Sequence, residues 1–115
     1  MNDSIFTEKR AFPRFEVSIP VSYVETHSKK TSEARTHDIS AGGVGIITEE
    51  ELSAGASLGI YLRMVDDGGE IYRRGKAIWS SPLDVNKYRV GIQLEEPNLK
   101  PIPIVLRTIK AQRKY

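Results

Sequence analysis

Short segments in which hydrophobic and polar residues alternate recur along most of the chain. In the first of them, every second residue from Val17 to Tyr23 is hydrophobic. A period of two is typical of a β-strand that buries one face. Other segments repeat this pattern or are short and apolar, and turn-forming residues separate them. The predicted strands are 17–25, 33–39, 44–48, 57–65, 70–80 and 87–94.

Glycine and proline residues mark where these strands should end or bend. The sequence Asp66-Asp67-Gly68-Gly69 predicts a hairpin, because glycine adopts positive φ without steric cost. Residues 81–84 predict the connection between the last two strands. Pro20 lacks an amide hydrogen, so the first strand is expected to lie at a sheet edge or to contain a bulge there. The number and short spacing of the strands favour an all-β protein, either an antiparallel barrel or a sandwich.

The hydrophobic period changes near the C-terminus. After Pro101 and Pro103 the apolar residues follow a helical spacing, and basic residues gather toward the end, where the helix dipole favours positive charge. A short C-terminal α-helix is therefore predicted over 101–113, with proline in its first turn. We expect residues 1–115 to form a single domain, in which a flexible leader (1–16) precedes the β region (17–96) and the helix.

Charge and composition narrow the range of functions. Seventeen Lys and Arg against fifteen Asp and Glu leave a net charge of +2, too balanced for the broad basic surface that non-specific nucleic-acid binding usually needs. The absence of cysteine excludes disulfides, thiolate zinc sites and cysteine nucleophiles. No apolar run resembles a signal peptide or is long enough to span a bilayer. We therefore expect a cytoplasmic protein with neither nucleic-acid binding nor membrane insertion.

The sequence offers little for catalysis or metal binding. His27 and His37 lie in or beside a polar loop, and no acidic or cysteine residue stands at metal-ligand spacing from them. His37, Asp38 and Ser40 cannot act as a triad, because adjacent residues of one strand do not converge on one point. We therefore expect no catalytic residue, no metal site and no cofactor, and the protein is not expected to be an enzyme.

Two arginines near the N-terminus form the first candidate binding motif, Arg10-Ala-Phe-Pro-Arg14. Pro13 disfavours a helix here, and on an extended segment the two arginine Cα atoms stand up to roughly 13 Å apart. Each guanidinium can bind a phosphate, or the O6 and N7 atoms of guanine, with two hydrogen bonds. The pair therefore fits a ligand larger than one phosphate. The alternative is a charged leader with no binding role.

The second candidate motif is Asp38-Ile39-Ser40-Ala41-Gly42-Gly43. The Asp38 carboxylate can accept hydrogen bonds from the donor edge of a guanine, and Ser40 adds a polar contact. Gly43 lets a ligand approach the backbone, because it carries no Cβ. The alternative is a turn that is closed by its own Asp and Ser side chains.

In this order and at this separation, the two motifs resemble the RxxxR and (D/N)xSxxG signature of PilZ domains. The segments Gly75–Trp79 and Tyr88–Leu94 resemble later strands of the same family, so the similarity extends over most of the chain. The resemblance implies a six-stranded antiparallel PilZ-type β-barrel with a short C-terminal α-helix. It also implies a bacterial receptor for the second messenger cyclic di-GMP.

The resemblance further implies a role for each motif. Arg10 and Arg14 would grip phosphate and guanine, while the second motif would contact a guanine from the barrel side. A basic residue at the position of Lys9 tends to accompany binding of an intercalated cyclic di-GMP dimer, so two ligand molecules per chain are expected. Trp79 could stack on a base, or it could pack as a core or edge residue. The expected ligand-binding residues are Lys9, Arg10, Arg14, Asp38, Ser40, Gly42, Gly43 and Trp79.

The predicted function is that of a receptor whose leader closes over cyclic di-GMP and reshapes a surface for an unidentified protein partner. Two other functions stay open at this point. One is a PilZ-fold adaptor that works through protein contacts and is not regulated by nucleotide. The other is a small OB-like barrel that binds single-stranded nucleic acid, against which the near-neutral charge counts.

Overall fold

The strands and the helix lie close to their predicted positions. The computed structural model describes residues 12–66 and 68–112 of the chain. The elements are β1 (Phe15–Glu16), β2 (Pro20–Glu25), β3 (Thr31–Ile39), β4 (Gly43–Thr48), β5 (Ser57–Arg63), β6 (Glu70–Asp84), β7 (Lys87–Leu94) and α2 (Pro101–Gln112).

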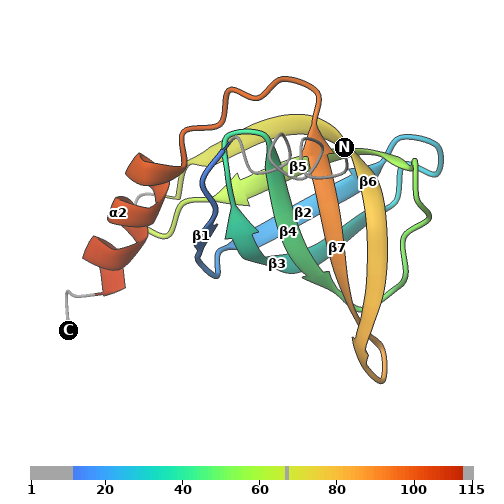
Figure 1. Cartoon of the computed structure of the whole chain (residues 1–115). Coiled ribbons are helices and arrows are strands. Elements are labelled where there is room, and N and C mark those ends of the chain that lie inside the picture. The colour runs from blue at the N-terminus through green and yellow to red at the C-terminus, as the bar shows by residue number, and fades with distance from the viewer. Residues whose placement is uncertain (1–11, 67, 113–115) are drawn as a thin grey trace, which may run out of the picture.

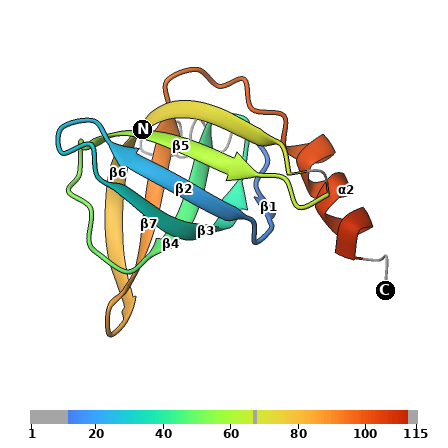
Figure 2. The same cartoon turned by 180° about the vertical axis from the view of Figure 1, so that it is seen from behind.

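Strands β2 to β7 form a closed antiparallel barrel. The hydrogen-bonded order is β3-β2-β5-β6-β7-β4, and a further pairing of β3 with β4 closes the ring. Figure 1 shows β4, β7 and β6 on the near side, and Figure 2 shows β2 and β5 from behind. Helix α2 lies at one end of the barrel, next to β1. The prediction of an all-β, six-stranded antiparallel barrel with a C-terminal helix is confirmed.

The barrel interior is filled by the apolar side of each strand. On β5, the side chains of Leu58, Ile60 and Leu62 are at most 2% exposed. Leu99, just before α2, and Ile104, within it, are buried as well and close one end of the core. Burying one such side chain stabilises a fold by about 1.5–3 kcal/mol, so this interior is the main source of the barrel's stability.

Strand β2 begins at Pro20, later than the predicted residue 17. Pro20 pairs with Arg35 of β3 and has no partner on β5. Proline is tolerated as the first residue of a strand, where its missing amide hydrogen breaks no ladder. The prediction that this strand lies at an edge or contains a bulge at Pro20 is therefore wrong, because the barrel closes around β2 and the register there is regular.

The predicted connection at 81–84 is also wrong, since β6 runs on to Asp84. These residues pair with β7, and the chain turns instead at Val85 and Asn86. Asn86 has a φ of 56°, a left-handed conformation that asparagine adopts more readily than most residues. The predicted hairpin before β6 is present, with Gly68 at a φ of 76°.

Paired structure begins inside the segment that was predicted to be a leader. Phe15 and Glu16 form β1, which pairs with Ile39 and Asp38 at the end of β3. Pairing along β1 places Arg14, the last residue of the first motif, next to Asp38, the first residue of the second. The residues that directly follow the first motif are therefore paired with Asp38 and Ile39 of the second motif before any ligand is considered.

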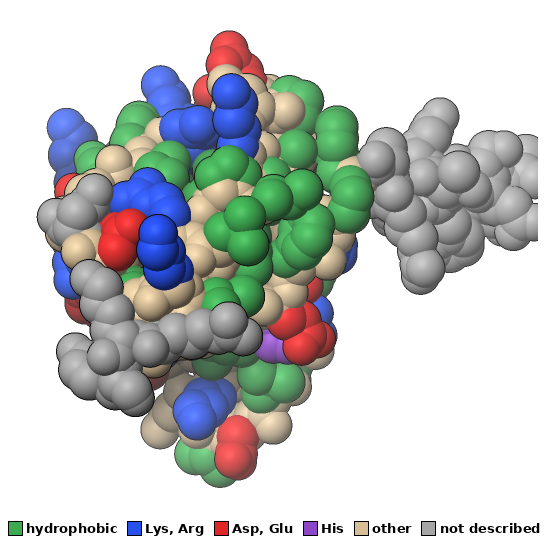
Figure 3. Space-filling view, turned by 90° about the vertical axis from the view of Figure 1, so that its left-hand side faces the viewer, with side chains coloured by type: hydrophobic (Ala, Val, Ile, Leu, Met, Phe, Trp, Pro, Cys, Tyr) green, Lys and Arg blue, Asp and Glu red, His purple; other side chains and the backbone are tan. Residues whose placement is uncertain are grey.

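Helix α2 buries one side against the barrel and exposes the other. Ile104 and Thr108 are buried, whereas Ile102, Leu106 and Ile109 are 41–60% exposed. Figure 3 looks onto the side of the molecule where α2 lies, and shows apolar side chains beside Lys and Arg side chains. Within the described ranges, no helix has the length and hydropathy needed to cross a membrane.

Truncating an interior side chain should destabilise the barrel. Leu62→Ala removes a side chain that is 0% exposed, so we expect the free energy of unfolding to fall by about 2–5 kcal/mol. Val85→Ala is the control, because Val85 is 82% exposed, and its effect should stay within about 0.5 kcal/mol. Urea unfolding followed by circular dichroism measures both variants. Equal losses in the two would contradict the inward orientation of Leu62.

Candidate functional site

A row of residues crosses neighbouring strands on the outer surface of the barrel. Asp38 on β3 pairs with Gly45 on β4, and Gly91 on β7 pairs with Trp79 on β6. The two glycines pair with each other, which completes the row. Val44, Ile46, Val90 and Ile92 flank the glycines along β4 and β7 and are buried in the core. Because side chains alternate along a strand, the row faces outward. We call these residues, Asp38, Gly45, Gly91 and Trp79, the site row.

The two glycines let the outer members of the site row lie on the backbone. A Cβ atom on Gly45 would stand 2.5 Å from Asp38 Oδ1, and one on Gly91 would overlap the Trp79 indole. The carboxylate therefore lies over Gly45, and the indole lies over Gly91. An acid and an aromatic ring thus approach each other across backbone that carries no side chain.

Two β-bulges lie next to the ends of the site row. The β3–β4 register shifts between Thr36 and Asp38, which makes His37 an extra residue. The β6–β7 register shifts between Ala77 and Trp79, so Ile78 is an extra residue there. A bulge interrupts the alternation of a strand and turns the next side chain. Consistent with this, Ile78 and Trp79 are both exposed, by 47% and 39%.

Cations surround the Asp38 carboxylate. Its side chain is 6% exposed, and each oxygen stands 3.4 Å from a guanidinium nitrogen, Oδ1 from Arg14 and Oδ2 from Arg89. The ring nitrogen Nδ1 of His37 lies 3.5 Å from Oδ2. These distances are long for charge-assisted hydrogen bonds, which are usually about 2.7–2.9 Å. A bound ligand can therefore replace these contacts with shorter ones.

Arg89 connects the two ends of the site row. While one guanidinium nitrogen faces Asp38, the guanidinium carbon lies 5.8 Å from the centre of the Trp79 ring. That separation is within the range of a cation–π interaction. The guanidinium thus lies between the carboxylate and the indole.

The second motif forms a tight turn that Ser40 closes. The Ser40 amide donates to the Gly43 carbonyl at 2.9 Å, and the Gly43 amide donates to Ser40 Oγ at 3.0 Å. For Ser40 these contacts match the alternative of a self-closed turn. Asp38 does not take part, because its carboxylate faces the arginines. A Cβ on Gly42 would stand 3.0 Å from the Phe12 ring, so glycine here admits the ring of the first motif.

A cavity of about 410 Å³ lies beside the site row. Its lining contains the predicted residues Arg14, Ser40, Gly42, Gly43 and Trp79, together with Phe12, Ile78, Ile92, Gln93, Leu94, Glu95 and Pro97. Asp38 is not part of the lining and joins the cavity through its contact with Arg14. The predicted residues Lys9 and Arg10 lie outside the described residues.

Sequence reasoning missed Arg89, Gly45, Gly91 and Phe12. The segment Tyr88–Leu94 contains a usable signal, because alternation places Arg89 and Gly91 on the same side of one strand. A glycine inside a strand often marks close approach of another group. Neither the alternation nor the glycine shows which strands lie beside β7, so neither could have placed Arg89 near Asp38 of β3.

Chemically, the site combines guanidinium groups, a carboxylate and an exposed indole around bare backbone. Guanidinium groups bind phosphate or the acceptor edge of a purine, a carboxylate accepts N–H donors, and an indole stacks on planar rings. This set suits a planar ring with donors and acceptors that is linked to an anionic group. Among the described residues, no group of three or more His, Cys, Asp and Glu is placed to hold a metal ion.

The sequence profile of the PilZ domain family matches residues 8–107. Within that span lie both motifs, every strand of the barrel and much of α2. A comparison with curated proteins gives no significant match.

Solved structures with the same fold include three from different bacteria. The PilZ domain with cyclic di-GMP of YcgR from Escherichia coli is 17% identical with a TM-score of 0.63, covering 92% of this chain and 93% of that one. The K. pneumonia MrkH–cyclic di-GMP complex is 21% identical with a TM-score of 0.63, covering 92% and 54%. The Bacillus subtilis inhibitor of motility MotI/DgrA is 15% identical with a TM-score of 0.61, covering 91% and 50%. The chain thus spans about half of the MrkH and MotI chains.

Adding a side chain at Gly91 should displace the indole of the site row. In Gly91→Ala the new Cβ would overlap Trp79, which is the only tryptophan of the chain, so we expect a clear change in the wavelength or intensity of tryptophan fluorescence. Gly59→Ala is the control, because its Cβ would crowd the Tyr72 ring at 3.0 Å instead, and it should leave the tryptophan signal unchanged. A wild-type spectrum in Gly91→Ala would contradict the placement of the indole over Gly91.

Proposed function

The chain belongs to the PilZ domain family, and from this membership we propose that it is a non-catalytic receptor for cyclic di-GMP. The observation that carries the proposal is the site row with Arg14 and Arg89, whose chemistry complements a guanine nucleotide. Similar folds support it, since the structures of YcgR, MrkH and Borreliella burgdorferi PlzA were determined with cyclic di-GMP.

In the proposed complex a guanine lies beside the site row. Asp38 accepts hydrogen bonds from the N–H donors of the base, and Trp79 offers a ring face for stacking. The guanidinium of Arg14 binds a phosphate or the O6 and N7 atoms of guanine. Gly42 and Gly43 line the cavity beside the ligand, and Ser40 holds their turn in shape.

The proposed switch is an exchange of partners at Arg14. This side chain is 53% exposed and contacts Asp38 at 3.4 Å, a weak pairing that a phosphate can replace. Lys9 and Arg10 would add positive charge from the leader, which closes over the ligand. Closure of the leader would reshape one surface of the domain for a downstream protein partner.

We further propose that residues 1–115 form a single domain and that the receptor acts in the cytoplasm, without inserting into membranes or binding nucleic acid. The balanced charge supports the last point, because nucleic-acid backbones select broad basic surfaces. The competing function is a PilZ-fold adaptor that is not regulated by nucleotide. Failure to bind cyclic di-GMP at tens of micromolar would favour that adaptor.

Removing either motif arginine should weaken ligand binding. We expect cyclic di-GMP to bind wild type with about 8 kcal/mol or more, which is micromolar or tighter. Arg14→Ala and Arg10→Ala should each lose about 2–4 kcal/mol, because charge-assisted bonds disappear and ligand charge is left unpaired. Isothermal titration calorimetry gives both values, with GMP as the weaker reference ligand.

Arg63→Ala is the matched control for the arginine variants. Arg63 is on β5, is 45% exposed and is ion-paired to Glu33 and Glu70, so its loss removes the same charge away from the site. Its affinity for cyclic di-GMP should equal that of wild type. If Arg14→Ala bound cyclic di-GMP with wild-type affinity, the first motif would not be part of the binding site.

The number of bound ligands should depend on Lys9. An intercalated cyclic di-GMP dimer carries twice the phosphate charge of one molecule, and a cation beside Arg10 and Arg14 offsets the added repulsion. We therefore expect two ligand molecules per chain in wild type. In Lys9→Leu the calorimetric ratio should move toward one while binding is retained, because lysine contributes less directional contacts than the arginines.

The stoichiometry has its own contradicting outcomes. A wild-type titration that saturates at one ligand per chain would contradict binding of an intercalated cyclic di-GMP dimer. A Lys9→Leu variant that still binds two would show Lys9 to be a solvated leader residue, as exposed charges often are. Either result leaves the receptor function itself in place.

A further inference from the structure

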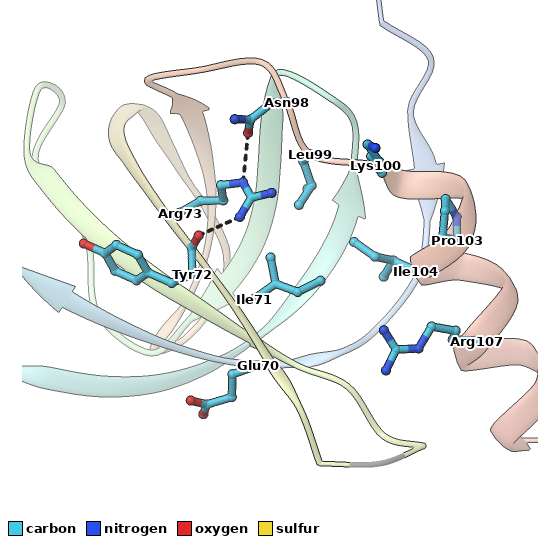
Figure 4. A pocket seen from close by; sticks show the side chains of 10 residues that line it. All are labelled: Glu70, Ile71, Tyr72, Arg73, Asn98, Leu99, Lys100, Pro103, Ile104 and Arg107. Carbon is cyan, nitrogen blue, oxygen red and sulfur yellow. Dashed lines mark hydrogen bonds between the residues drawn. The ribbon is translucent and has the colours of Figure 1, made fainter.

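A second hollow lies between the start of β6, the loop that follows β7, and α2. Figure 4 shows this hollow with its side chains. Its volume is about 390 Å³, and its lining consists of Glu70, Ile71, Tyr72, Arg73, Asn98, Leu99, Lys100, Pro103, Ile104 and Arg107. We call it the β6–α2 groove. None of these residues belongs to the cavity beside the site row.

Two basic residues of the groove, Arg73 and Lys100, are not paired with an acidic residue in the described part of the chain. Arg73 donates from Nε to Asn98 Oδ1 at 2.9 Å and from a terminal nitrogen to the Tyr72 carbonyl at 2.8 Å. Both acceptors are neutral, so they position the guanidinium without cancelling its charge. Lys100 has no hydrogen bond or ion pair with any residue in the described part of the chain. It immediately precedes α2, whose dipole also places positive potential at this end.

The acids near the groove are engaged by other groups. Glu70 lies 3.5 Å from Arg63, which is outside the groove. Asp66 holds Arg107 with two hydrogen bonds of 2.8 Å. Glu96 accepts a hydrogen bond from the neutral Asn98 amide and keeps its charge, but it does not line the groove, whose lining has Arg73, Lys100 and Arg107 against Glu70. The groove therefore presents net positive charge, and the first turn of α2 contains no acid to reduce it.

The part of the groove between its basic side chains is lined by apolar side chains. Figure 4 shows the Arg73 guanidinium beside Asn98 and the Tyr72 carbonyl, the Arg107 side chain extending from α2, and Ile71 and Ile104 between these two arginines. Beyond the groove, Ile102 of α2 is 56% exposed, and the charged residues of the helix, Arg107 and Lys110, are both basic. The same combination of apolar and basic character thus extends along the helix, farther than a small anion would reach.

We propose that the β6–α2 groove is the docking site for an acidic segment of a protein partner. A carboxylate of that segment binds the free N–H groups of Arg73 and the ammonium of Lys100, and an adjacent apolar side chain rests on Ile71 and Ile104. Guanidinium forks match carboxylates in geometry, which makes Arg73 the more selective of the two cations.

The position of the groove links it to the ligand cavity, and this step rests on the proposed function. Glu95 and Pro97 line the cavity, while the next residues of the same loop line the groove. The loop is bonded to the second motif, since Leu99 donates to the Ala41 carbonyl at 3.3 Å. A ligand that moves the motif turn or the loop therefore acts directly on one wall of the groove.

A peptide titration tests the docking site. The probe is the peptide acetyl-Glu-Leu-Glu-Leu-Glu-amide, and its counterpart has glutamine at every glutamate position. Nitrogen-15 NMR of the full chain, with and without cyclic di-GMP, maps the affected amides. We expect the acidic peptide, and not the glutamine peptide, to shift the amides of 70–73, 98–100, 102 and 104. Combining Arg73→Gln with Lys100→Gln should weaken binding at least about tenfold.

Arg35→Gln combined with Lys87→Gln is the matched control, because it also removes one arginine and one lysine, both exposed and outside the groove. Equal weakening in the control would reduce the effect to net charge and overturn the proposal. Amide shifts outside the groove, or equal binding of the acidic and glutamine peptides, would also overturn the proposal.

Two other outcomes change the assignment. If the chain binds phosphatidylserine vesicles and the Arg73→Gln, Lys100→Gln variant does not, the groove is a site for a membrane surface instead. Peptide binding to a chain whose amides do not shift on addition of cyclic di-GMP would refute the receptor function and leave the docking site intact.

Discussion

The functional surface depends on one carboxylate that the fold has almost removed from water. Asp38 is 4% exposed, and a buried ionised carboxylate without a partner destabilises a fold by several kcal/mol. The chain supplies partners from two directions, Arg14 before the barrel and Arg89 on β7. Because Arg14 precedes the barrel, the requirement of Asp38 for a cation also holds the first motif against the second. The groups that stabilise the carboxylate are the groups that a phosphate or a guanine would recruit.

The backbone around Asp38 is shaped by the same requirement. The Asp38 carboxylate lies over β4 and the Trp79 indole lies over β7 at the places that a Cβ would occupy, which restricts positions 45 and 91 to glycine. The bulges at His37 and Ile78 then orient Asp38 and Trp79 relative to their strands. Glycines within strands normally weaken a sheet, so their presence in two adjacent strands indicates a surface built for contact.

The sequence predicted the barrel well because alternation and turn residues are local signals. It predicted most of the strands and the helix, but not the end of β6, since Pro82 and Asp84 are turn-forming residues that here lie in an irregular, bulged pairing. Five of the predicted site residues line one cavity: Arg14, Ser40, Gly42, Gly43 and Trp79. Their roles toward a ligand stay predictions, whereas Arg89 was missed because its approach to Asp38 depends on pairing between distant strands. The roles of Lys9 and Arg10 stay predictions.

The geometry of two ion pairs distinguishes a permanent contact from an exchangeable one. Arg107 binds Asp66 with two hydrogen bonds of 2.8 Å and ties α2 to the turn before β6. Arg14 and Arg89 each approach Asp38 with one nitrogen at 3.4 Å. A short bidentate pair strongly resists separation, whereas a long single contact is readily replaced by a ligand atom with better geometry. The chain therefore keeps its helix in place while leaving the arginines of the site available to a ligand.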